Sequence, residues 1–172
     1  MLEGPTLLLR PLRVEDSEAL YAVASDPLIW AVHPAHDRWQ WPVFERFFDD
    51  ALASGGALVI TDRRSGRIIG SSRYQRQPDS LEIGWTFLAR DYWGGATNRE
   101  LKRLMLAHAL ANEPRVTFRV GEENWRSRRA MEKIGGRLTD DTERREMAGV
   151  TVRHVIYEIT AADFAAGPLA PG

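Results

Sequence analysis

The chain has 172 residues, enough for one domain with a substantial hydrophobic core and too few for two. Hydrophobic residues make up 44% and charged residues 27%, as in ordinary globular proteins. The net charge of −1 argues against a dedicated nucleic-acid-binding protein, and the absence of cysteine excludes disulfides, thiolate metal sites and a cysteine nucleophile. The apolar run Leu7–Leu9 is too short for a signal peptide or a membrane span, so we expect a cytoplasmic protein without a membrane partner.

Charge is distributed unevenly along the chain. Residues 1–60 carry 4 Lys/Arg against 9 Asp/Glu, a balance of −5, whereas residues 90–136 carry 10 against 6, a balance of +4. The basic segment fits an anionic ligand, and the acidic segment could attract a cationic one. Solvated surface charge is the alternative explanation for both.

Hydrophobic periodicity predicts a chain of alternating strands and helices. The predicted strands are Thr6–Arg10, Ala57–Thr61, Arg67–Tyr74, Leu81–Phe87, 116–120, Arg137–Thr139 and Val150–Ile159. The predicted helices run from Glu15 or Asp16 to Ser25, over Pro42–Ser54, from Thr97 or Asn98 to Ala111, and over Asn124–Ile134. We expect a charged turn at Asp140–Glu146, one domain over residues 1–165 and a disordered Ala/Gly/Pro-rich tail at 166–172.

A glycine pair, Gly94 and Gly95, lies between the Leu81–Phe87 strand and the next helix. Glycines just before a helix N-terminus leave several backbone N–H groups unpaired and pointing at one spot, where the helix dipole favours negative charge. The turn therefore predicts a phosphate site, with an ordinary strand–turn–helix connection as the alternative. It matches neither GxxxxGK[ST] nor a complete GxGxxG, so the two commonest nucleotide motifs lose support.

The helix after this turn has one apolar face. Thr97 and Glu100 have the spacing of a capping box, which places the helix start at Thr97 or Asn98. The apolar positions include His108, which we expect in the core, whereas Lys102 falls mostly off this face.

Three motifs then occur in a fixed order along the chain. They are Glu82–Trp85, Tyr92–Gly95 with its following helix, and Asn124–Ser127 leading to Ala130–Gly135. Together with the opening Leu8–Leu12, they resemble the GNAT superfamily of acetyl-CoA-dependent N-acetyltransferases, and within it the ribosomal-protein N-terminal acetyltransferase-like branch. The resemblance covers nearly the whole chain. It implies an α/β (α+β) GNAT fold, with a mixed, mostly antiparallel sheet splayed into a V around the acetyl-CoA site and flanked by helices.

The resemblance also assigns acetyl-CoA to particular residues. The backbone of Phe87 and Leu88 would pair with the pantetheine amides, and Asn124 would bind the cosubstrate from the next helix. Arg126, Arg128 and Arg129 could meet the nucleotide phosphates, and we assign this role to Arg126 and Arg129. The pyrophosphate would lie on the N–H groups of Gly94, Gly95, Ala96, Thr97, Asn98 and Arg99.

The chain departs from the family pattern at two places. Ala96 and Asn98 stand where the pyrophosphate loop normally has small residues, and Asn98 is bulkier than expected. Met131 stands where many GNAT enzymes have a tyrosine that protonates the leaving thiolate, and methionine cannot donate a proton. Relatives in the N-terminal acetyltransferase branch use a serine three residues after the asparagine, a place held here by Ser127. The resemblance thus makes Ser127 the candidate acid, with a helix-surface serine as the alternative.

Acetyl transfer to an amine requires a neutral nucleophile. An α-amino group has a pKa of about 8 and a lysine one of about 10.4, so a site without an evident strong base suits α-amines better. Glu82 is the candidate base, because it points away from the face of Leu81 and Ile83. The alternative is a solvated strand carboxylate, or one held by Arg73 on the neighbouring strand.

The stretch Leu28–Trp41 is rich in Trp and His, and we expect it to line the acceptor pocket. Trp30, His33, His36 and Arg73 are the candidate acceptor-binding residues. A metal site at the two histidines lacks a third ligand, so no metal is expected. The predicted function is acetyl transfer from acetyl-CoA to a primary amine, a protein N-terminal α-amine in the first place. The alternatives are a small-molecule amine (amino acid, polyamine, antibiotic) as acceptor, or a catalytically silent CoA-binding domain. Because related enzymes often dimerise, a homodimer would fit.

Overall fold

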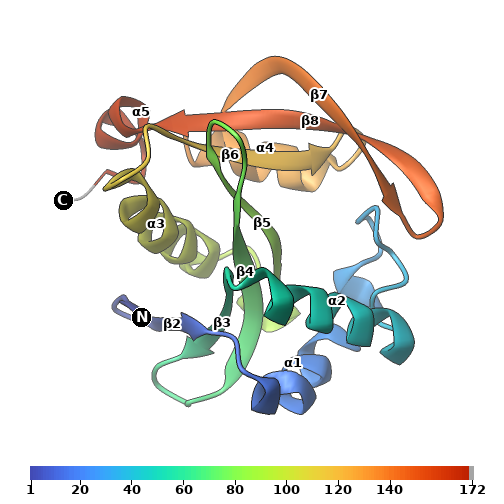
Figure 1. The fold of residues 1–172 in the computed structure, drawn as a ribbon. Helices are drawn as coiled ribbons and strands as arrows, with labels where there is room; N and C mark the ends of the chain where they lie inside the picture. The colour runs from blue at the N-terminus through green and yellow to red at the C-terminus, as the bar shows by residue number, and fades with distance from the viewer. Residues whose placement is uncertain (171–172) are drawn as a thin grey trace.

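The computed structural model describes residues 1–170, and its centre is one eight-stranded sheet with the order β1-β2-β3-β4-β5-β6-β8-β7 (Figure 1). Every neighbouring pair is antiparallel except β5 and β6, so the expected mixed, mostly antiparallel sheet is confirmed. The strands are β1 Leu2–Glu3, β2 Leu7–Pro11, β3 Ala57–Asp62, β4 Ile68–Arg76, β5 Leu81–Leu88, β6 Arg115–Gly121, β7 Arg137–Met147 and β8 Val150–Thr160.

Helices cover both faces of this sheet. The α-helices are α1 Ser17–Ala24, α2 Trp41–Ser54, α3 Ala96–Leu110, α4 Trp125–Lys133 and α5 Ala161–Ala166, and short 3₁₀ turns occur at Val14–Asp16, Pro27–Ile29 and Arg90–Tyr92. Successive strand residues point to opposite faces. Val59 therefore packs in a core cluster with α1 and α2, whereas its neighbour Ile60 packs in a second cluster with α3 and α4.

The parallel strands β5 and β6 part soon after they meet. They pair only at Leu81 with Val116 and at Glu82 with Thr117. Beyond these two pairs, β5 keeps its ladder with β4, and β6 keeps its ladder with β8, so each strand is held on its outer side alone. The result is the V-shaped opening that the sequence analysis expects.

A β-bulge lies in β5 beside this opening. The register with β4 shifts by one residue between Ser71 opposite Phe87 and Arg73 opposite Gly84. The extra residue places Trp85 at φ 53°, in the left-handed region that a bulky residue seldom adopts. The bulge redirects the side chain of Trp85, and strain of this kind is concentrated at functional sites.

Helix α3 differs from its predicted geometry in two ways. It begins at Ala96 with Gly95 as N-cap, and the carboxylate of Glu100 accepts hydrogen bonds from the backbone N–H of Thr6 and Leu7 at 2.8 and 2.9 Å instead of closing a capping box. The buried face of the helix includes Lys102, and His108 is exposed, so both predictions for these residues are wrong. Its buried residues are Leu101, Lys102, Met105, Leu106 and Ala109.

The C-terminal part also corrects the sequence analysis. The expected turn Asp140–Glu146 belongs to the continuous strand β7, and the chain reverses at Ala148 and Gly149, both with positive φ. Part of the expected disordered tail is ordered: Ala166 ends α5, and Leu169 is 2% exposed in the cluster with α3. Residues 171 and 172 lie outside the described residues.

No helix in residues 1–170 is both long and apolar enough to cross a membrane. The cytoplasmic location stays a prediction.

Candidate active site

A cleft of about 860 Å³, here called the outer cleft, opens where β5 and β6 part and α3 begins. The backbone of β5 at Phe87 and Leu88 forms one wall, and the Gly94-Gly95 turn forms the end next to the N-terminus of α3. Helix α4 supplies the opposite wall. The structure thus brings these predicted residues together around one cleft. The side chains of Phe87 and Leu88 are buried, so these residues present their backbone edge to the outer cleft.

The glycine turn has room for a ligand. A Cβ added at Gly94 or at Gly95 would meet no atom within 4 Å. Gly94 requires glycine for conformational reasons, because its φ is +70°, whereas Gly95 has a φ of −110° that any residue adopts. Asn98 and Arg99 also line the outer cleft, whereas Ala96 and Thr97 lie in the first turn of α3 outside its lining. Unpaired N–H groups and open space fit a pyrophosphate here.

The basic residues of α4 separate into two groups. Arg126 and Arg129 are exposed and line the outer cleft, and the guanidinium of Arg126 stacks on Trp93 at 4.4 Å. Arg128 donates instead to the hydroxyl of Tyr157 at 3.2 Å and to the carbonyl of Glu122 at 3.1 Å. This division supports Arg126 and Arg129 as the phosphate partners.

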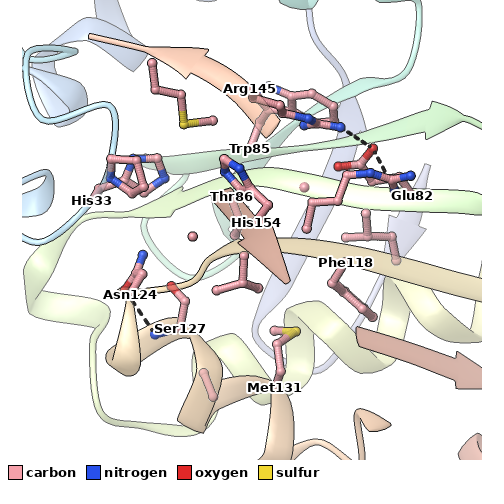
Figure 2. Close-up of a pocket in the computed structure, with 18 of the residues that line it drawn as sticks. His33, Glu82, Trp85, Thr86, Phe118, Asn124, Ser127, Met131, Arg145 and His154 are labelled. Atoms are coloured by element: carbon pink, nitrogen blue, oxygen red, sulfur yellow. Dashed lines mark hydrogen bonds and ion pairs between the residues drawn. The ribbon is translucent and has the colours of Figure 1, made fainter. Parts of the chain in front are cut away.

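A smaller cavity of about 180 Å³, here called the inner pocket, lies deeper between β5 and β6 (Figure 2). It shares His33, Thr86, Asn98, Ser127 and Ala130 with the outer cleft, so the two spaces adjoin. A molecule bound along the outer cleft can therefore present its end to the inner pocket.

Ser127 and Asn124 lie together at the start of α4, as Figure 2 shows. Asn124 is 5% exposed, and its Oδ1 accepts a hydrogen bond from the backbone N–H of Ser127 at 3.3 Å, which makes it the N-cap of α4. Its amide nitrogen has no acceptor among residues 1–170. Asn124 lines the inner pocket only, whereas Ser127 lines both spaces.

Glu82 is the one carboxylate among the described residues that line the inner pocket, and it is 1% exposed. Its Oε2 accepts from Gln77 at 2.7 Å and forms ion pairs with Arg119 at 3.2 Å and Arg145 at 3.1 Å. Arg73 is not its partner, contrary to that alternative of the sequence analysis. Arg119 and Arg145 also contact Glu143, so two arginines and two glutamates form a closed network.

Lys102 is a candidate that the sequence analysis missed. It is 4% exposed, lines the inner pocket, donates from Nζ to Thr86 Oγ1 at 3.0 Å and lies 5.4 Å from the centre of the Phe118 ring. Burial lowers the pKa of Lys102 to about 8. A lysine one position off an apolar stripe gives no signal of burial in a single sequence.

The candidate acceptor-binding residues differ in whether they line the cavities. His33 lines the inner pocket and the outer cleft, and burial lowers its pKa to about 3, so the ring is neutral. Its Nδ1 accepts from the backbone N–H of Ala35 at 2.9 Å, which leaves the proton on Nε2. Trp30 is a core residue that lines the outer cleft, and His36 is exposed and lines none of the cavities described here.

Met131 does line the inner pocket, as its place in the motif implies, and no tyrosine of residues 1–170 lines that pocket. The described part of the chain also contains no group of three or more His, Cys, Asp or Glu placed to hold a metal ion.

Comparison with known proteins identifies this arrangement. The family model of the acetyltransferase (GNAT) domain matches residues 6–137. A GCN5-related N-acetyltransferase from Brucella melitensis superposes with a TM-score of 0.78 at 22% identity, over 96% of this chain and 80% of that one. Two further neighbours are spermidine N-acetyltransferase from Vibrio cholerae in complex with CoA and spermine (TM-score 0.70, 16% identity, 93% and 98% covered) and Mycobacterium smegmatis RimJ in complex with CoA-disulfide (TM-score 0.71, 19% identity, 95% and 86% covered). The resemblance of the sequence motifs to the GNAT superfamily is confirmed, and the chain belongs to the GNAT family of acetyltransferases.

Proposed function

We propose that this protein transfers the acetyl group of acetyl-CoA to a primary α-amine, by direct attack of the amine on the thioester. The observation that carries the proposal is the parting of β5 and β6 beside the Gly94-Gly95 turn. The free edge of β5 offers backbone groups to the pantetheine amides, and the glycine turn offers N–H groups to the pyrophosphate. Arg126 and Arg129 offer positive charge to the phosphates.

Three side chains of the inner pocket carry the proposed chemistry. Ser127 lies where the two spaces adjoin and donates the proton to the departing thiolate. Lys102 places a positive charge or a proton donor in the same pocket, which stabilises the developing negative charge. Glu82 receives the proton of the attacking amine through Oε1, because its Oε2 is already used by three donors.

The proposal of an α-amine as acceptor rests on the weak base that Glu82 provides. At neutral pH an α-amine with a pKa of about 8 is partly neutral without help, whereas a lysine side chain needs a strong base. Glu82 has only one oxygen left for this task. The inner pocket is therefore better equipped for an amine that loses its proton easily.

The test follows release of free thiol from acetyl-CoA across a panel of peptides and small amines, with acceptor-free hydrolysis as the blank. We expect turnover with α-amines and a rise in melting temperature with acetyl-CoA. Gly95→Val is the variant of choice, because a side chain at this position meets open space in the protein and fills the place proposed for the pyrophosphate. We expect it to fold normally and to lose most of the thermal shift.

The control is Gly66→Asn. Gly66 is an exposed turn glycine where an added Cβ would also meet no atom within 4 Å, and its φ of +71° restricts the substitution to Asn. Unchanged acetyl-CoA affinity in Gly95→Val would contradict the binding site. Tight binding without turnover on any amine would contradict the transferase proposal and favour a silent CoA-binding domain.

A further inference from the structure

Two arginines near the inner pocket form no ion pair in the described part of the chain. Arg73, on β4, is 6% exposed, and its Nε and Nη2 are buried without a hydrogen-bond partner among residues 1–170. Arg38, in the loop before α2, lines the inner pocket. Within residues 1–170, neither guanidinium has a carboxylate within 4 Å, although Asp50 and Glu82 lie near enough to Arg73, and Asp37 near enough to Arg38, to favour their charged forms.

These two arginines lie against the same aromatic ring. The guanidinium carbons of Arg38 and Arg73 are 4.4 and 5.8 Å from the centre of the Phe47 ring. Arg73 is also 4.6 Å from the ring of Trp85, the strained bulge residue of β5. Burial and the neighbouring Arg73 lower the pKa of Arg38 to about 10, which still leaves it charged at neutral pH. Two positive charges thus share one partly desolvated corner.

No other charge nearby among residues 1–170 forms an ion pair with either of them. Arg145 faces Trp85 from β7, but Glu82 and Glu143 already pair with it. Burying a charge without a hydrogen-bonded partner is costly, so the buried guanidinium of Arg73 beside the half-buried one of Arg38 indicates a missing anion. Water and surface counter-ions reach such a corner less readily than an exposed arginine.

A further cavity of about 580 Å³, here called the arginine pocket, leads to this corner from the side of β7. Arg38, Trp85, Arg145 and Met147 line both the arginine pocket and the inner pocket. Arg38 lines the arginine pocket and the inner pocket but not the outer cleft, so the missing anion is separate from the proposed phosphates. Arg73 lines none of the three cavities and meets this corner through Phe47 and Trp85. Two carboxylates also line the arginine pocket: Glu146 accepts from Thr151, and Asp37 favours the charged form of Arg38 without forming an ion pair with it.

We propose that the acceptor is a primary amine that also carries a carboxylate, and that Arg38 and Arg73 bind this carboxylate while the amine enters the inner pocket. This inference rests on the proposed transferase function. Guanidinium groups bind carboxylates through paired, charge-assisted hydrogen bonds, which is the interaction that both arginines lack. A polyamine such as the spermine held by the Vibrio cholerae neighbour would instead bring positive charge to two cations.

The carboxylate could be the α-carboxylate of an amino acid or an acidic side chain at a peptide N-terminus. The experiment therefore measures kcat/KM per neutral amine for two matched sets. One compares free amino acids with their amides, and the other compares tripeptide amides that begin with Asp or with Asn. Spermidine is the cationic comparison. We expect the carboxylate member of at least one set to be preferred about tenfold or more, mainly through KM.

Arg38→Gln and Arg73→Gln test the assignment of the site. Each is expected to reduce the preference for the carboxylate-bearing acceptor to less than about threefold while acetyl-CoA affinity stays unchanged. Arg73→Lys is expected to retain part of this preference. Arg76→Gln is the matched control, since Arg76 lies on the same strand but is exposed and pairs with Glu113. Two arginine variants are used so that a folding defect in one, seen as a lowered melting temperature, leaves the other to decide.

The outcomes separate the two proposals. Equal or better use of neutral or cationic acceptors by the wild-type protein overturns this inference, as does a preference that survives both arginine substitutions. If no amine is acetylated, the transferase proposal fails, and the carboxylate site is judged by binding alone. A thermal shift with N-acetylaspartate that both arginine substitutions remove then supports the site, and its absence in the wild-type protein overturns it.

Discussion

Lys102 donates a hydrogen bond from Nζ to Thr86 Oγ1 at 3.0 Å, and no carboxylate of the described chain forms an ion pair with it. The hydroxyl of Thr86 in turn lies 2.8 Å from that of Ser72 on β4. A buried ammonium whose one hydrogen-bond partner among residues 1–170 is a hydroxyl is poorly compensated, and such groups are found most often at functional sites. The inner pocket is thus stabilised less well than an apolar core would be.

Lys102→Met is predicted to raise stability at neutral pH and to lower kcat. The pKa of Lys102 is lowered to about 8, so below pH 8 the lysine is charged in both the folded and the unfolded state and its burial is fully costly. Between about pH 8 and 10.5 the folded protein holds a neutral amine while the unfolded chain stays protonated, so the free energy of unfolding of the wild type rises with pH. The difference from Lys102→Met is expected to shrink by about 3 kcal/mol over this range.

Urea unfolding of both proteins from pH 7 to 10 measures this difference. Comparison with Lys102→Met cancels the titration of other groups. A difference that does not change with pH would contradict the buried, perturbed lysine, and a kcat within twofold of wild type would remove Lys102 from the catalytic proposal.

Glu82→Gln is predicted to affect both stability and rate. The substitution leaves Arg119 and Arg145 with Glu143 as their remaining carboxylate, and removal of one partner from a buried ion pair typically costs about 3 kcal/mol. If Glu82 also receives the amine proton, the rate falls most at low pH, where neutral amine is scarce, and least near the pKa of the acceptor. A pH–rate profile checks this; a uniform loss across pH would assign Glu82 a purely structural role.

Two substitutions of Asn124 separate its capping role from cosubstrate binding. Asn124→Asp keeps an oxygen to cap α4 but loses the amide donor, whereas Asn124→Ala loses both. We expect the Ala variant to lose about 1 kcal/mol of stability and the Asp variant little. Both are expected to bind acetyl-CoA about tenfold more weakly in calorimetric titrations. Unchanged affinity in Asn124→Asp would mean that Asn124 is a helix cap and no more.

Ser127→Ala is predicted to lower kcat by roughly 10²-fold with nearly unchanged acetyl-CoA affinity, because the thiolate would lose its proton donor. The structure gives the hydroxyl of Ser127 no hydrogen-bond partner within residues 1–170, so no large loss of stability is expected. Steady-state kinetics with one acceptor, together with Ser127→Thr as the variant that keeps a hydroxyl, measures the effect. Equal loss in both variants would indicate a packing role.

Much of the fold could be predicted from the sequence because local patterns specify it. Period-2 alternation located β5, and the helical spacing with its closing glycines located α2. The predicted position of the turn in the C-terminal hairpin is wrong because β7 is charged along its length and its exposed face carries no hydrophobic alternation. The capping box failed for a tertiary reason, since Glu100 bonds Thr6, ninety-four residues away in the chain.

The candidate site was predictable only in part. Backbone-determined features, such as the glycine turn, follow from short motifs, and the structure places them where the motifs imply. Which charged side chains lie near the inner pocket depends instead on contacts between residues far apart in the sequence. Arg145 comes from β7 and Arg38 from the loop before α2, and nothing in their neighbours along the chain marks them. The acidic balance of residues 1–60 allows either a cationic ligand or solvated surface charge, whereas Arg73, near the pocket, has two buried nitrogens without a hydrogen-bond partner among residues 1–170.

The short contact between β5 and β6 has a mechanical consequence. The sheet consists of a five-stranded half, β1 to β5, and a three-stranded half, β6 to β8, joined by a seam of two residue pairs. Few ladder hydrogen bonds join the two halves, so they are held together mainly by side chains, namely those of the shared core cluster and the ion pairs of Glu82 with Arg119 and Arg145. A ligand that contacts both edges of the seam would couple the two halves, and their unfolding would then become more cooperative.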